Sequence, residues 1–223
     1  HCLIDPGLMS ARAVDQYLAE CSEDTWTFER QTGFASTPVL AASYGTVQER
    51  QTRANYLATR QYLRAEYDSQ PEDQKNPALL AIADTIAYVQ IDEGAHEANF
   101  KSLMQIYMRF RPDLALDAMV KSHNHYTMPI VKLPNAEEFK TAILSAEIIT
   151  LMDFGKEILR PALKSLGLAN RRALRKAAVE VQKLPENAVV QIADNSQEPI
   201  PEGAEVYQMS ALGEFTQITK KSN

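Results

Sequence analysis

Hydrophobic positions recur every three or four residues along most of the chain, in long stretches rich in Ala, Leu, Gln, Glu and Arg. This spacing is typical of amphipathic helices, and short breaks at Pro, Asn, Asp and Gly separate the stretches. The pattern predicts helices over 10–25, 38–66, 76–111, 113–124, 136–164 and 168–183. At a rise of 1.5 Å per residue, a helix of about thirty residues is on the order of 45 Å long, which favours a large up-and-down bundle.

Strand-like patterning is confined to the end of the chain. Residues 187–215 contain two short apolar or β-branched runs around a turn with Pro and Gly, which predicts a late hairpin or an ordered tail. We therefore expect an all-α bundle of long antiparallel helices over 1–184, followed by a tail or small appendage over 185–223.

The composition is that of a globular chain, with 45% apolar and 23% charged residues among 223. This length can bury a sizeable core in one domain, or in one domain with an appendage. A net charge of −6 disfavours nucleic acid as the main partner, because binding a phosphate backbone relies on clustered Lys and Arg. The basic run at 170–178 is typical of a solvated helix face.

Two further features concern the location of the protein. Cys2 and Cys21 are too few for a disulfide framework, which favours a reducing compartment. No stretch of about eighteen uncharged apolar residues occurs, so we expect no membrane span. The chain opens without Met and without a signal-peptide pattern, which predicts that it begins inside a longer polypeptide.

The stretch "YVQIDEGAHEANF" at 88–100 places several charges on one predicted helix. Glu93 and His96 are three residues apart, so both can reach one metal ion, and Asp92 and Glu97 flank them. A Glu-x-x-His pair of this kind also occurs often as a simple surface pair on a charged helix. The spacing alone therefore leaves both interpretations open.

The residues before this cluster favour the metal site. Leu79, Ile82 and Ile86 lie on the same helix face as Glu93 and form an apolar stripe that leads to it. A carboxylate at the end of such a stripe must be neutralised, paired or bound to a cation, because an isolated charge in a core is costly.

Glu49 places a comparable charge on an otherwise uncharged face of the predicted helix 38–66. At steps of three and four it shares a helix face with Ala42, Gly45, Thr52 and Tyr56. An ion pair with Arg50 or Arg53 at the surface explains this carboxylate equally well, so this pattern also leaves two interpretations open.

Two motifs together carry a resemblance to a known family. They are "QERQT" at 48–52 and, some forty residues later, "DEGAHE" at 92–97, and a Met-Pro at 128–129 follows. This arrangement resembles the soluble acyl-acyl-carrier-protein desaturases, the ferritin-like di-iron enzymes of plant plastids and actinobacteria. The resemblance covers about 8–165 and implies a ferritin-like helical bundle.

The resemblance also implies roles for individual residues. Glu49, Glu93 and His96 correspond to iron ligands of the family, and carboxylate and imidazole donors suit iron. Thr52 corresponds to a hydroxyl near the face of the cluster where oxygen binds. Asp92 corresponds to a carboxylate behind the ligands that could orient an imidazole from another helix.

A complete site of this family takes a Glu from each of two helices and a Glu-x-x-His from each of two others. This chain supplies one of each, and none of His1, His123 and His125 has a Glu three residues before it. We expect His123 and His125 to be capping or surface residues. Three explanations are open: an upstream segment or separate chain supplies the other ligands, two copies complete a site across a two-fold axis, or the site is degenerate.

The implied activity is the introduction of a cis double bond into an acyl chain on acyl carrier protein, in fatty acid biosynthesis. It requires two Fe ions, O₂ and electrons from a ferredoxin-type donor, and the family implies a homodimer in a bacterial cytoplasm or the plastid stroma. Alternatives are another ferritin-like di-iron oxygenase (a hydroxylase or N-oxygenase), an iron-handling protein, or a non-catalytic homologue with a degenerate metal site.

The implied substrate requires two further features, an apolar cavity and a basic surface patch. The acyl chain needs a narrow apolar cavity beside the cluster, and Ala41, Ala42 and Gly45 either leave room for it or permit close helix packing. The acidic carrier protein needs a basic patch, for which Lys101, Arg109, Arg111 and the run 171–175 are candidates.

Overall fold

The structure is a computed structural model that describes residues 37–126, 150–192 and 199–218, together with the isolated positions 10, 12, 15, 137, 138, 141 and 145. Most of the predicted helix 10–25, the first part of the predicted helix 136–164 and the Met-Pro at 128–129 lie outside the described residues.

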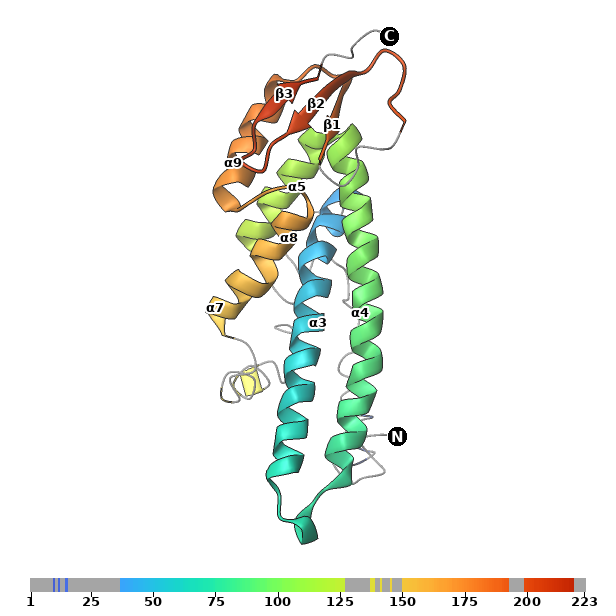
Figure 1. The fold of residues 1–223 in the computed structure, drawn as a ribbon, viewed down its shortest axis with the longest axis vertical. Helices are drawn as coiled ribbons and strands as arrows, with labels where there is room; N and C mark the ends of the chain where they lie inside the picture. Colours follow the sequence, from blue (N-terminus) through green and yellow to red (C-terminus); the bar gives the residue numbers. More distant parts are fainter. Residues whose placement is uncertain are drawn as a thin grey trace.

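A long helical hairpin dominates the fold (Figure 1). It consists of α3 (Pro38–Ser69), the short 3₁₀ helix η1 (Glu72–Gln74) and α4 (Pro77–Phe110), with α3 and α4 side by side and antiparallel. Both helices begin with an N-cap side chain followed by Pro: Thr37 accepts a hydrogen bond from Leu40 N, and Asn76 accepts one from Ala78 N. These local signals confirm the starts of the two predicted helices to within about a residue.

Shorter helices pack on the hairpin from one of its ends to about the middle of α3 (Figure 1). They are α5 (Pro112–His125), α7 (Leu151–Asp153), the π-helix η3 (Phe154–Leu159), α8 (Arg160–Ser165), α9 (Arg171–Glu180) and the 3₁₀ helix η4 (Val181–Lys183). The prediction of a mainly helical fold of long antiparallel helices is confirmed. None of the described helices is both long and apolar enough to cross a membrane.

A small sheet follows the helices, formed by β1 (Ala188–Gln191), β2 (Glu205–Met209) and β3 (Phe215–Gln217). β2 and β3 pair in antiparallel fashion and form a C-terminal hairpin, one strand later than the sequence pattern predicted. The two apolar runs noted in the sequence are β1 and β2, however, and they pair in parallel, with Val189 opposite Val206. The intervening residues 192–204 are long enough for the crossover that parallel strands require.

The main core lies where the sheet meets the helices. Met108 of α4, Leu116 of α5, Leu174 of α9, Val190 of β1 and Met209 of β2 are all buried in one cluster. The sheet therefore packs on the helical core in the described part of the chain, and the division of the chain at 184/185 stays a prediction.

The rest of the α3–α4 hairpin is less covered. The buried side chains of α3 lie between Leu40 and Glu49, and α4 exposes Tyr88, Ile91 and Ile106. The candidate metal ligands lie in this transition between the buried and the exposed part of the hairpin, where a side chain can be held by neighbours and still be reached from outside.

Two sequence expectations are wrong. Arg109 is fully buried and donates a 2.6 Å hydrogen bond to the Pro199 carbonyl, so it belongs to no surface patch. His123 is also buried, because its face of α5 packs inward, and its Nδ1–H donates to the Met119 carbonyl over 3.0 Å. Burial lowers the pKa of His123 to about 4, so the ring is neutral at pH 7.

Candidate metal centre

The three predicted ligands converge between α3 and α4. Glu49 lies on α3, and Glu93 and His96 lie one turn apart on α4. One donor atom from each of them lies within 4.8 Å of the other two. His96 Nδ1 is 3.4 Å from Glu49 Oε2 and 3.5 Å from Glu93 Oε2. Among the described residues this is the one group of three or more His, Cys, Asp or Glu side chains so arranged.

The two carboxylates are much less accessible than the imidazole. The side chains of Glu49 and Glu93 are 12% and 14% exposed, whereas that of His96 is 60% exposed. Burial, followed by the hydrogen bond and the negative charge of Glu93, raises the pKa of Glu49 to about 7, and His96 opposes the shift. Without a cation, the Glu49 carboxyl is therefore protonated in about half of the molecules at pH 7.

This donor set fits iron. Carboxylate and imidazole ligands suit this metal, and a divalent ion between Glu49 and Glu93 would replace the proton of Glu49 and remove the repulsion. On the side of the exposed His96 the three donors can be reached from solvent. The sequence-predicted ligands are thus brought together in a geometry that can accept a cation.

The two other predicted site residues lie beside these ligands. The Thr52 hydroxyl, one turn after Glu49, donates to backbone carbonyls of its own helix, Gln48 O at 3.2 Å and Glu49 O at 2.9 Å. Asp92 is exposed on α4, next to Glu93. The roles of Thr52 and Asp92 stay predictions.

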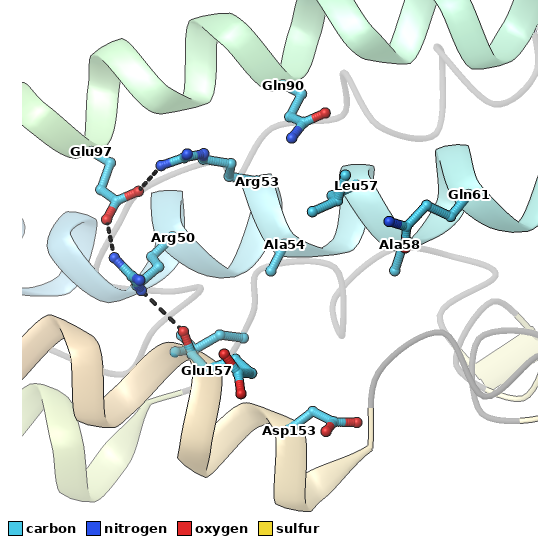
Figure 2. A pocket seen from close by; sticks show the side chains of 11 residues that line it. Arg50, Arg53, Ala54, Leu57, Ala58, Gln61, Gln90, Glu97, Asp153 and Glu157 are labelled. Atoms are coloured by element: carbon cyan, nitrogen blue, oxygen red, sulfur yellow. Dashed lines mark hydrogen bonds and ion pairs between the residues drawn. The ribbon is translucent and has the colours of Figure 1, made fainter.

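Two arginines and one carboxylate form an ion-pair network next to the three ligands. Glu97 accepts from Arg50 Nη1 at 2.5 Å and from Arg53 Nη1 at 3.0 Å, and Arg50 Nε donates to the Glu157 carbonyl at 3.0 Å (Figure 2). The surface pair proposed between Glu49 and these arginines is therefore wrong, because both arginines bind Glu97. In the sequence, the feature that points to this pairing is Glu97, the carboxylate that directly follows His96.

A cavity of about 350 Å³ lies beside this network, between α3, α4 and the segment of α7 and η3 (Figure 2). Its lining combines an apolar part with charged and amide side chains from all three segments. The apolar part is formed by Ala54, Leu57, Ala58 and Ile158, and the polar part by Arg50, Arg53, Gln61, Gln90, Glu97, Asp153 and Glu157. Such a lining can receive a molecule with an apolar chain and a polar end.

An aromatic stack near Glu49 combines buried Tyr44 with half-buried Tyr126 and Phe154. The ring of Tyr126 stacks on Tyr44 and on Phe154, with centroid separations of 5.4 and 5.5 Å. Burial raises the pKa values of Tyr44 and Tyr126 far above the usual range, and the charge of Glu49 adds to both shifts. Both phenols therefore remain protonated at neutral pH.

Gly45 permits close helix packing. A Cβ added at Gly45 would meet the ring of Phe100 on α4 at 2.6–2.8 Å. The aromatic ring occupies the space that a side chain would need. Of the two interpretations of this glycine, the structure favours the contact between α3 and α4 over a substrate tunnel.

Comparison with protein-family models matches residues 5–201 to the family described as fatty acid desaturase. No curated protein and no solved structure matches the chain. Desaturases are oxidoreductases that use iron and dioxygen, and the cluster of Glu49, Glu93 and His96 provides donors that could bind the metal. Because the match extends over most of its 223 residues, the chain belongs to the fatty acid desaturase family.

Proposed function

We propose that this chain is a dioxygen-dependent desaturase that introduces a cis double bond into an acyl chain carried on acyl carrier protein, with iron held by Glu49, Glu93 and His96. The observation that carries the proposal is the convergence of the three donors from two facing helices, within 4.8 Å of one another. The sequence motifs around these residues support the choice of the carrier-protein desaturases within the wider family.

The residues have separate tasks in this proposal. Glu49 and Glu93 bind the metal with carboxylates that α3 and α4 already hold close together, and His96 binds from the accessible side. Bound iron would supply the activation of dioxygen that the removal of two hydrogens from adjacent saturated carbons requires. Thr52 offers a hydroxyl one turn from Glu49, and the neutral phenols of Tyr44 and Tyr126 add no further negative charge near Glu49.

The acyl chain needs an apolar path beside the metal. The 350 Å³ cavity is a candidate, because Ala54, Leu57 and Ile158 provide an apolar surface and Arg50 and Arg53 connect it to the turns that carry the ligands. Depth and bend of such a path would determine where the double bond forms.

A di-iron centre needs a second Glu and a second Glu-x-x-His. In the proposal these donors come from an upstream segment or from a separate chain. A ferredoxin-type donor supplies electrons, and the enzyme acts as a homodimer. The basic side chains Arg172 and Arg175, both exposed on α9, support the run 171–175 as the docking patch for the acidic carrier protein.

The test is anaerobic ferrous reconstitution of the protein, together with any chain that purifies with it, followed by iron analysis and an assay with acyl carrier protein substrates, ferredoxin and O₂. About two irons per bundle and a cis-alkene product are expected. Glu93→Gln should lose the iron, whereas Asp84→Asn, at an exposed position of the same helix, should retain it. A hydroxylated product would indicate a different di-iron oxygenase, and absence of iron from the wild-type protein would refute the proposal.

A further inference from the structure

The Glu97 carboxylate is bound on both oxygens by side chains of the facing helix. Arg50 Nη1 lies 2.5 Å from Glu97 Oε1, and Arg53 Nη1 lies 3.0 Å from Glu97 Oε2 (Figure 2). The Glu97 side chain is 15% exposed, whereas Arg50 is 29% and Arg53 is 50% exposed, so the pair with Arg50 is the better shielded of the two. The two ion pairs therefore fix α3 against α4 at this level.

This level is also that of the candidate metal ligands. Arg50 directly follows Glu49 on α3, and Glu97 directly follows His96 on α4. A slip of one helix by one residue would move a side chain by 1.5 Å along the axis and turn it by about 100°. Such a slip would separate Glu49 from Glu93 and His96, and the contact between Arg50 and Glu97 opposes it at the level of the three donors.

Arg50 holds a third segment as well. Its Nε donates to the Glu157 carbonyl in the π-helix η3, over 3.0 Å. The guanidinium group thus uses Nε for η3 and Nη1 for α4 at the same time. A planar fork with donors in fixed directions can make both bonds together, whereas a Lys ammonium is a single point charge.

We propose that Arg50 is a positioning residue for the metal site: by binding Glu97 and the Glu157 carbonyl it holds Glu49, Glu93 and His96 in the geometry that binds a divalent cation. The inference rests on the proposed metal-binding role of these three residues. It assigns a purpose to the two motif residues next to the ligands, because Arg50 of one motif binds Glu97 of the other.

Removal of the Arg50 charge distinguishes two possible effects of Arg50 on metal affinity: orientation of the ligands, and electrostatic repulsion of the cation. Arg50→Gln takes a positive charge away from the neighbourhood of two carboxylates, and by Coulomb's law alone it should raise the affinity for a divalent cation. If Arg50 positions the ligands, its loss should instead lower the affinity for the cation, since loss of a residue that orients metal ligands typically costs about 10- to 100-fold in affinity. The direction of the change therefore decides between the two.

The experiment compares Arg50→Gln, Arg50→Lys and the matched control Arg64→Gln in the full chain. Arg64 also joins α3 to α4, through a 2.6 Å ion pair with Asp84, but both side chains of this pair are exposed. The first readout is the affinity for Co²⁺, followed by its visible absorption. The second is the position of the His96 ring signals in NMR spectra of the metal-free protein, assigned with His96→Gln.

We expect Arg50→Gln and Arg50→Lys each to lower the Co²⁺ affinity about tenfold and to shift the His96 signals, and Arg64→Gln to change neither. Full rescue by Lys, an equal loss in Arg64→Gln, or an affinity that rises in Arg50→Gln would overturn the inference. If the wild-type protein binds no Co²⁺, the metal function fails. The NMR comparison then still decides, because unshifted His96 signals in Arg50→Gln refute positioning and shifted signals support it.

Discussion

Replacement of Glu49 by Gln should stabilise the metal-free protein at alkaline pH. The carboxylate is buried next to Glu93, and its pKa rises from the ordinary value of 4.5 to about 7. Each pKa unit corresponds to 1.36 kcal/mol, so ionisation of Glu49 in the folded protein costs up to about 3 kcal/mol. Because water reaches the site at the exposed His96, we reduce this figure to about 2 kcal/mol.

The sign of the pH dependence follows from the raised pKa. Below pH 4.5 Glu49 is protonated in both the folded and the unfolded state, and its contribution to stability is fully present. As the pH rises from 4.5 to about 7, the unfolded state releases its proton first, so the folded protein loses stability. The advantage of Gln at position 49 should therefore be complete at pH 8 and fall below about 1 kcal/mol at pH 5.

Thermal unfolding in the presence of a chelator measures this effect. At pH 8, Glu49→Gln should raise the melting temperature by roughly 4–8 °C for a chain of this size. Glu66→Gln, at an exposed position of the same helix, is the matched control and should change it little. If Glu49→Gln is no more stable than the wild type at pH 8, or if its advantage is the same at pH 5, ionisation of Glu49 does not destabilise the folded protein.

Two further predictions concern positions outside the metal ligands. Gly45→Ala should lower the free energy of unfolding by about 1–3 kcal/mol, because the new Cβ would collide with Phe100; unchanged denaturant unfolding would show that the ring moves freely. The protein should lose stability as the pH falls from 6.5 to about 4, because His123 binds a proton in the unfolded state but stays neutral in the folded state. His123→Gln should reduce this loss. Exposed His125→Gln is the control, and equal pH profiles for both variants would contradict the second prediction.

The elements that the sequence predicted well depend on local signals. The starts of α3 and α4 follow from Thr37 and Asn76 before Pro, which define helix ends without any tertiary contact. The meeting of Glu93 and His96 follows from their spacing of three on one helix. The position of Glu49 opposite them was an expectation from two motifs together, and the distances to His96 Nδ1 agree with it.

The features that were missed depend on partners far away in the chain. Phe100 fills the space above Gly45 from 55 positions away, and no pattern around Gly45 indicates this. Glu97 competes successfully with Glu49 for Arg50 and Arg53, which only the packing of α3 on α4 reveals. Periodicity assigns a side chain to a helix face, but the opposing helix decides which of two carboxylates an arginine reaches.

The distribution of charge in this region favours a divalent cation over a buried proton. With Glu97 bound by Arg50 and Arg53, the remaining carboxylates at the site are Glu49 and Glu93, which carry two negative charges when ionised. A proton shared between them balances one of these charges, whereas a divalent ion balances both. Metal binding must then release the proton of Glu49, so affinity should fall as the pH drops below about 7. The arginines thus have a second consequence: they keep a third carboxylate from adding to the repulsion that the cation has to overcome.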